Sequence, residues 1–125
     1  MLNTGSEKGY KKLDVWKEGN KFVILIYKYT KDFPKSEEYG LVSQLRRAAL
    51  SITTNIVEGQ ASMSKKEFLN FLNIANRSLV ETDYLLEVSF ELQFLSKEKY
   101  DELEQLRYKI GALLNGLMRA IKSRL

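Results

Sequence analysis

The stretch Gln44–Gly59, QLRRAALSITTNIVEG, combines two helical patterns in one short segment. Its apolar residues, together with the preceding Leu41, recur at intervals of three and four, so at about 100° per residue they share one face of a helix. We interpret this face as part of a buried core. Arg46 lies on one border of the face, and the other border carries a polar row made of Gln44, Arg47, Ser51, Asn55 and Glu58.

The polar row is typical of a half-buried seam rather than of a solvated surface. Asn, Ser, Gln and paired charges in register can satisfy one another's hydrogen bonds where water is scarce. Glu58 and Glu81 are the acids that we place near apolar faces, and Arg46 or Arg47 can hold such carboxylates as bidentate pairs that fix helix register. We therefore predict an assembly seam that comprises Gln44, Arg46, Arg47, Ser51, Asn55, Glu58 and Glu81.

Helical patterns account for nearly the whole chain outside this stretch. The single proline, Pro34, stops the first helix, and Ser64 and Glu67 form an S-x-x-E capping box that opens the third. We place the helices from Asp14, as N-cap, to Lys31, from between Ser36 and Leu41 to Gly59, from Ser64 to about Leu95, and from Ser96 onward.

The connections between these helices are short, so consecutive helices must lie side by side and antiparallel. The predicted fold is all-α, an antiparallel up-down-up-down four-helix bundle, with residues 1–13 as a flexible N-terminal segment and 14–125 as a single domain. The third helix carries more apolar residues than one stripe can hold. We infer that part of it faces another subunit, in an assembly that we expect to be a ring.

Composition excludes most familiar active sites. The chain has no Cys and no His, which removes thiolate and imidazole nucleophiles, bases and metal ligands, including the Glu-x-x-His pairs of di-iron bundles. We therefore expect no catalytic residue, no metal and no cofactor. The N-terminus lacks an apolar signal region, and the longest apolar run, Phe22–Tyr27, is far too short to span a bilayer. These features favour a cytoplasmic protein without a membrane partner.

Basic residues gather in two places although the net charge is only +4. The spacing of Lys17, Lys21, Lys28 and Lys31 confines them to about 80° of the first helix, which makes a basic stripe. Such a stripe can contact phosphates or can simply be a solvated face. Arg119, Lys122 and Arg124 are secondary candidates, because cations at a helix C-terminus also favour the macrodipole.

An acidic row on the third helix has the opposite charge. Asp83, Glu87 and Glu91 repeat every four residues with no lysine at the helical offsets that would relieve their repulsion. We expect the first helix or a neighbouring subunit to supply a cationic partner. Trp16, Tyr10 and the other tyrosines could stack on bases, but no aromatic motif or sheet platform supports this, so we assign the aromatic residues to cores and interfaces.

Three blocks of the chain resemble a known family: LDVWKEGNKFVILIYKYTKDFP, EYGLVSQLRRAALSITTNIVEG and SKKEFLNFLNIANRSLVETDYLLE. They look like the small bacterial four-helix-bundle proteins first noticed as reading frames inside intervening sequences of large-subunit ribosomal RNA genes. That family is similar to the accessory proteins of diversity-generating retroelements. The resemblance implies a homopentameric ring with a basic surface that acts with RNA or DNA and a reverse transcriptase, and it implies no enzymatic activity.

Two functions from different classes remain open. The first is a non-enzymatic homopentameric bundle that binds RNA or another nucleic acid through clustered Lys and Arg. The second is a structural or protein-binding adaptor whose charges serve only subunit assembly. Salt-dependent binding to nucleic acid separates them, since phosphate contacts weaken steeply as salt rises.

Overall fold

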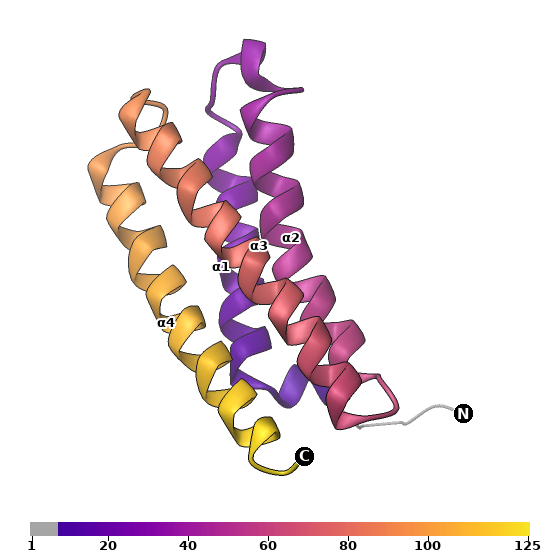
Figure 1. Ribbon diagram of the computed structural model, residues 1–125. Helices are drawn as coiled ribbons and strands as arrows, with labels where there is room; N and C mark the ends of the chain where they lie inside the picture. The colour runs from indigo at the N-terminus through magenta and orange to yellow at the C-terminus, as the bar shows by residue number, and fades with distance from the viewer. Residues whose placement is uncertain (1–7) are drawn as a thin grey trace.

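The computed structural model describes residues 8–125, which form four long helices. Figure 1 shows that these helices lie side by side. Consecutive helices pack against each other, and the fourth helix also packs against the first. The predicted all-α, up-down-up-down four-helix bundle is therefore confirmed. The helices are α1 (Asp14–Thr30), α2 (Leu41–Gln60), α3 (Lys65–Glu91) and α4 (Lys97–Lys122), with two 3₁₀ turns, η1 (Gly9–Lys12) and η2 (Lys35–Glu37).

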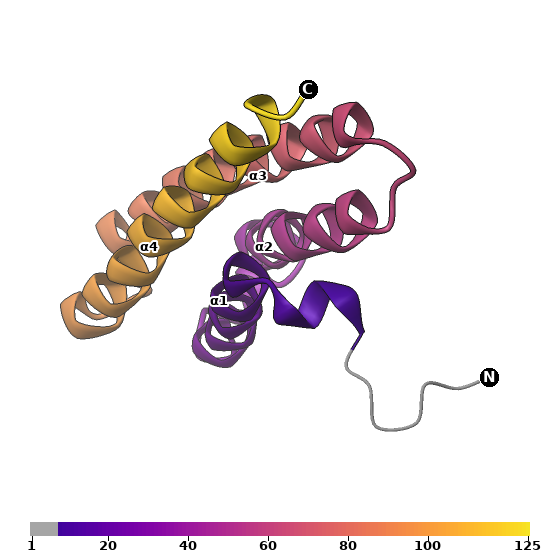
Figure 2. The ribbon, with the colours of Figure 1, turned by 90° about the horizontal axis from the view of Figure 1, so that it is seen from below.

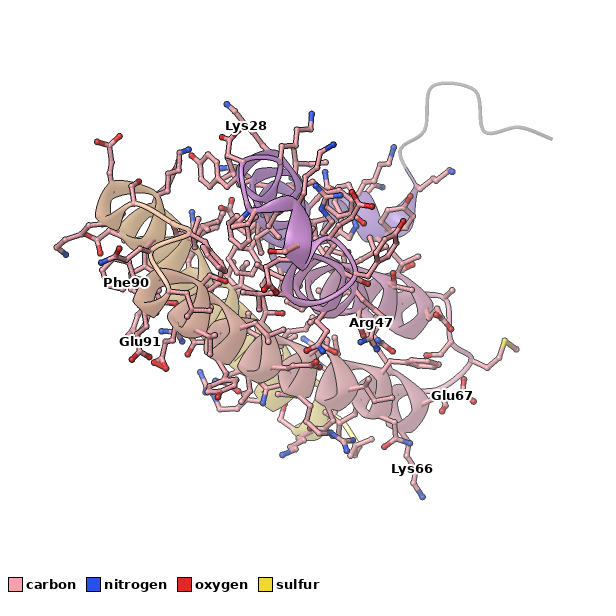
Figure 3. The ribbon with its side chains drawn as sticks, turned by 90° about the horizontal axis from the view of Figure 1, so that it is seen from above. Lys28, Arg47, Lys66, Glu67, Phe90 and Glu91 are labelled. Atoms are coloured by element: carbon pink, nitrogen blue, oxygen red, sulfur yellow. The ribbon has the colours of Figure 1, made fainter. Side chains whose placement is uncertain are left out.

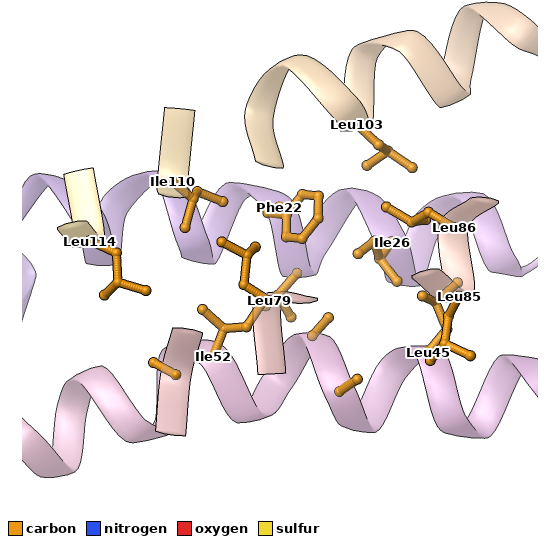
Figure 4. Packing of buried hydrophobic residues seen from close by; sticks show 14 of the residues in the cluster. Phe22, Ile26, Leu45, Ile52, Leu79, Leu85, Leu86, Leu103, Ile110 and Leu114 are labelled. Carbon is orange, nitrogen blue, oxygen red and sulfur yellow. The ribbon is translucent and has the colours of Figure 1, made fainter. Parts of the chain in front are cut away.

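The core runs along the bundle axis and takes residues from all four helices, as the close view in Figure 4 shows. Phe22 of α1, Leu45 of α2, Leu86 of α3 and Ile110 of α4 have no exposed surface. Burial of such side chains contributes about 1.5–3 kcal/mol each, so the apolar stripes drive the association of the helices. The apolar face predicted within Gln44–Gly59 lies in this core.

The apolar surplus of α3 has a partner within the chain. Because α3 packs against both α2 and α4, it needs two apolar faces rather than one, and most of its large side chains are buried or half-buried. Ile74, Val80 and Tyr84 of α3 stay exposed, as does Leu92 just beyond its end. The surplus alone therefore does not require another subunit.

The starts of α3 and α4 follow the sequence prediction closely. The Ser64 hydroxyl accepts a hydrogen bond from the Glu67 amide at 3.1 Å, and Ser96 accepts one from the Lys99 amide at 3.2 Å. The α1 start differs, because Leu13 occupies the cap position and Asp14 lies in the first turn. A carboxylate in the first turn still interacts favourably with the positive end of the helix dipole and so stabilises the helix.

The end of α3 comes earlier than expected, at Glu91 rather than near Leu95. Gln93 adopts a positive φ of 66°, and the Phe94 amide donates to the Ser89 carbonyl at 2.9 Å. Together with the bond from the Gln93 amide to the Phe90 carbonyl, this is a Schellman motif, which terminates the helix. A non-glycine residue at C′ leaves no sign of this motif in the sequence.

Gly59 is not the residue that ends α2, which continues to Gln60. A Cβ at Gly59 would lie 2.8 Å from a ring carbon of Phe68 and 2.9 Å from the Cβ of Phe71. The absent side chain thus allows α2 and α3 to approach each other closely at this end of the bundle.

The ordered structure extends before Asp14. Residues 1–7 of the predicted flexible segment lie outside the described residues, but Gly9–Lys12 form η1. The centres of the Tyr10 and Trp16 rings are 5.1 Å apart, in an edge-to-face arrangement. This turn lies at the same end as the C-terminus, as the view in Figure 2 shows. Among the described residues, none of the helices is long and apolar enough to cross a membrane.

Candidate nucleic-acid interface

The basic stripe of Lys17, Lys21, Lys28 and Lys31 lies on the outer face of α1, and all four side chains are exposed. The opposite face carries the buried Val15, Phe22 and Ile26, so burial of the core fixes the outward direction of the lysines. Figure 3 shows Lys28 pointing away from the bundle. Ile24, 60% exposed, interrupts the stripe at its middle.

The stripe members differ in their ionic partners. Lys21 lies 3.5 Å from a Glu18 carboxylate oxygen, and Lys109 of α4 lies 3.6 Å from the same oxygen. Within residues 8–125, Lys17, Lys28 and Lys31 have no carboxylate within ion-pairing distance. Three of the four stripe lysines therefore have no ionic partner within the described residues and are available to an external one.

The second basic cluster, Arg119, Lys122 and Arg124, is exposed at the end of α4. The Lys65 ammonium at the start of α3 donates to the Arg124 carbonyl at 3.5 Å, so one more cation adjoins the cluster. Antiparallel packing also places the start of α1 at this end (Figure 1). The antiparallel topology predicted from the sequence implies this arrangement, because it places the starts of α1 and α3 beside the end of α4.

The predicted assembly seam divides into a bonded part and an exposed part. The hydroxyl oxygens of Ser51 and Ser78 are 2.8 Å apart across the α2–α3 border, and the Asn55 amide donates to the Ser51 carbonyl at 2.7 Å. Ser78 is an addition to the predicted seam. The other residues of this border, Gln44, Arg47, Glu58 and Glu81, are exposed and form no ion pair with one another within the described chain.

Arg46 does not hold a carboxylate as predicted. Its Nε donates to the Thr30 hydroxyl at 2.9 Å, and its guanidinium donates to the Tyr27 carbonyl at 3.2 Å. The guanidinium also lies 4.7 Å from the centre of the Tyr27 ring. These contacts lie at the C-terminal end of α1, where carbonyl groups lack helical partners, so Arg46 caps that end and fixes α2 against α1.

One member of the acidic row of α3, Asp83, has its cationic partner on α4 rather than on the first helix, whereas Glu87 and Glu91 form no ion pair within the described residues. Arg107 lies 3.3 Å from the Asp83 carboxylate and donates to Glu104 at 3.1 Å. The Asp83 contact lacks hydrogen-bond geometry, and Asp83 Oδ1, Glu104 Oε2 and Arg107 Nε are buried atoms without a hydrogen-bond partner. Three charged groups thus share a half-buried site between α3 and α4.

The protonation of this site is shifted. Burial is the main factor that raises the pKa of Glu104, to about 7, and the adjoining Asp83 carboxyl adds to the effect while Arg107 opposes it. Burial likewise raises the pKa of Tyr100, and the negative charges of Glu104, Glu87 and Asp83 add to that shift. Residues 8–125 hold no group of acidic side chains suited to a metal ion.

The opposite flank of α4 is joined to α1 by polar contacts. The Tyr29 hydroxyl donates to Glu102, the Lys99 ammonium lies 5.0 Å from the Tyr29 ring centre, and Lys99 pairs with Asp32 at 3.8 Å. Lys97, Lys99 and Lys109 of α4 are therefore engaged within the chain, in contrast to most of the lysines on α1.

Comparison with known proteins places the chain in a family. The model of the family described as 23S rRNA-intervening sequence protein matches residues 11–116, which confirms the resemblance inferred from the sequence. A crystal structure of a protein of unknown function from the S23 ribosomal protein family of Bacteroides thetaiotaomicron is similar, with a TM-score of 0.76 and 26% identity. The similarity covers 84% of this chain and 95% of that one. No curated protein matches the chain.

Proposed function

Because the chain belongs to the 23S rRNA-intervening sequence protein family, we propose that it is a non-enzymatic, homo-oligomeric bundle that binds RNA or another nucleic acid through its basic surface. The main support for the proposal is the exposure of the stripe lysines on α1 and their lack of ionic partners. Lys17, Lys28 and Lys31 are exposed and have no ion pair within the described chain, so they can contact phosphates without first giving up a partner. Each such contact releases counterions from the nucleic acid, which drives binding.

The second part of the proposal is self-association, with five subunits as the state that the resemblance implies. A ring repeats the stripe around its axis, so that many weak phosphate contacts act together. The exposed apolar residues Ile24, Val80 and Leu92 are available for subunit contacts. Light scattering at micromolar concentration measures the mass, and a monodisperse monomer of 14.5 kDa would contradict this part. A reverse transcriptase or another nucleic-acid enzyme is the further protein partner that the resemblance suggests.

The test of nucleic-acid binding compares the wild-type chain with a variant in which Lys17, Lys21, Lys28 and Lys31 are all changed to Gln. Labelled single-stranded and structured RNA are titrated at several salt concentrations, with circular dichroism on the same samples. We expect the variant to keep its helix content, because exposed ion pairs contribute only about 0–1 kcal/mol. The slope of its salt dependence should fall by about 0.7–0.9 for each lysine that binds a phosphate in the wild type.

Two results would favour the adaptor function instead. One is a wild-type chain that binds no RNA at low salt, and the other is a quadruple variant that binds with the wild-type slope. In either case the stripe would be a solvated or subunit-pairing face.

A further inference from the structure

A hollow on the outer side of α2, near its start, combines aromatic, apolar and cationic groups. It is lined by Tyr27 of α1, by Glu38 and Tyr39 of the loop before α2, and by Val42, Ser43, Arg46, Arg47 and Leu50 of α2. Leu50 and Tyr27 are 46% and 36% exposed, so the hollow presents apolar surface to solvent. A second hollow adjoins it on the far side of Arg46 and includes Lys31 and Lys35. The stripe on α1 therefore ends beside this pair of hollows.

Tyr39 is the least covered aromatic side chain of the described residues, at 91% exposure. The turn η2 and the start of α2 hold the loop that carries it, and the Leu41 amide donates to the Glu37 carboxylate at 3.2 Å. Its ring is thus presented on a fixed backbone without contributing to the core. The neighbouring Glu38 carboxylate raises the pKa of the Tyr39 hydroxyl through a hydrogen bond and its negative charge.

The two arginines of the hollow have different roles. Arg46 is held by the Tyr27 carbonyl, the Thr30 hydroxyl and the Tyr27 ring, and these contacts occupy only part of its set of N–H donors. Arg47 is exposed and forms no ion pair within residues 8–125. A guanidinium is suited to bidentate contact with phosphate, and a preorganised one loses little entropy on binding. Glu38 also lines the hollow, but the two guanidinium groups outnumber its single carboxylate, so the hollow still favours an anion.

We propose that this hollow accepts one unpaired nucleotide, with its base stacked against Tyr39 and its phosphate on Arg47 and Arg46. The proposal rests on the function proposed above and narrows its ligand to nucleic acid with unstacked bases. A duplex keeps its bases stacked on one another and can offer only phosphates to this site. Single strands or loops should therefore use the aromatic wall, whereas duplexes should not.

The experiment titrates an oligouridine strand and an RNA duplex of the same length against the full chain and three tyrosine variants. Tyr39→Ala should weaken binding of the single strand by about tenfold, the loss expected when one stacked base is released, and should change duplex binding by less than about twofold. Tyr39→Phe should bind like the wild type. Tyr108→Ala is the matched control, because Tyr108 is also well exposed, at 72%, but lies on α4 away from the hollow.

The outcomes separate this inference from the broader function. If the wild type binds RNA but Tyr39→Ala and Tyr108→Ala behave alike, the nucleotide site is wrong and the basic-surface function stands. If Tyr39→Ala weakens the strand and the duplex equally, the ring does not stack and the site is again wrong. If the wild type binds neither RNA at low salt, both proposals fail. Circular dichroism of each variant verifies that the bundle is folded.

Discussion

The outer face of α1 and the outer edge between α3 and α4 both carry several charges, but they use them in opposite ways. On α1, Lys28 and Lys31 are exposed and have no ion pair within the described chain. Between α3 and α4, Asp83, Glu104 and Arg107 are half-buried and joined across two helices. The difference arises because α1 turns its charges away from its neighbours, whereas α3 and α4 turn theirs toward each other.

This contrast separates charges that hold the fold from charges that can serve a partner. A half-buried cation between two carboxylates cannot be removed without leaving like charges close together in a site of reduced polarity. Replacement of an exposed lysine leaves no buried charge without a partner, because water solvates the groups around it. The same residue types therefore predict loss of stability in one region and loss of binding in the other.

The largest effect on stability should come from Arg107→Gln. The variant leaves Asp83 and Glu104 facing each other without their shared cation, and we expect a loss of about 2 kcal/mol in the free energy of unfolding at pH 8. Lys28→Gln is the control from the α1 face and should change stability by less than about 0.5 kcal/mol. Urea unfolding of both variants measures the difference. Equal losses would show that the α3–α4 cluster is no more structural than the stripe.

A smaller effect should appear in the pH dependence of Glu104→Gln. Because the pKa of Glu104 is raised to about 7, its contribution to stability is fully present below its unfolded pKa, about 4.3, and is lost as pH rises through about 7. Allowing for the solvent that reaches this side chain, the wild type should lose roughly 1 kcal/mol between pH 5.5 and 8.5 that the Gln variant retains. Parallel stability curves for the two chains would contradict the shift.

The smallest effect on stability should come from the seam between α2 and α3. Asn55→Leu removes the hydrogen bond to the Ser51 carbonyl, whereas Glu58→Leu changes an exposed residue of the same border. We expect both variants to keep their helix content, and Asn55→Leu to disturb the assembly more, because buried polar groups can specify register. Light scattering and circular dichroism test this. If the seam does not specify the assembly, both variants will have the same mass distribution as the parent chain.

The sequence predicts the fold because its apolar periodicity and its helix signals agree. The apolar face of Gln44–Gly59 lies in the core, and the caps at Ser64 and Ser96 form as their spacing indicates. A local sequence signal predicts structure less well where the same residue type can have two structural roles. Gly59 has the features of a helix end but instead allows close contact with Phe68.

The site is less predictable because pairing across helices depends on side-chain direction. The stripe lysines follow from helical spacing alone, and the structure places all four outward. The sequence pattern predicts that Arg46 holds a carboxylate, but the C-terminal end of α1 supplies the Tyr27 carbonyl and the Thr30 hydroxyl as its acceptors instead. Arg107 lies 24 residues after Asp83 in the chain, so no local spacing links the two. Exposure of Tyr39 likewise follows from the path of a loop rather than from a motif.

The most direct test of the central claim compares two sets of three lysines that differ in their partners. One variant changes Lys17, Lys28 and Lys31 to Gln, and the other changes Lys97, Lys99 and Lys109, which pair with Asp101, Asp32 and Glu18. Both variants have the same formal charge. When RNA binding is measured at several salt concentrations, we expect the slope of the log binding constant against log salt to fall by about 2–3 for the first variant. The slope of the second variant should be nearly unchanged. Equal slopes would mean that only net charge matters and would contradict a specific basic interface on α1.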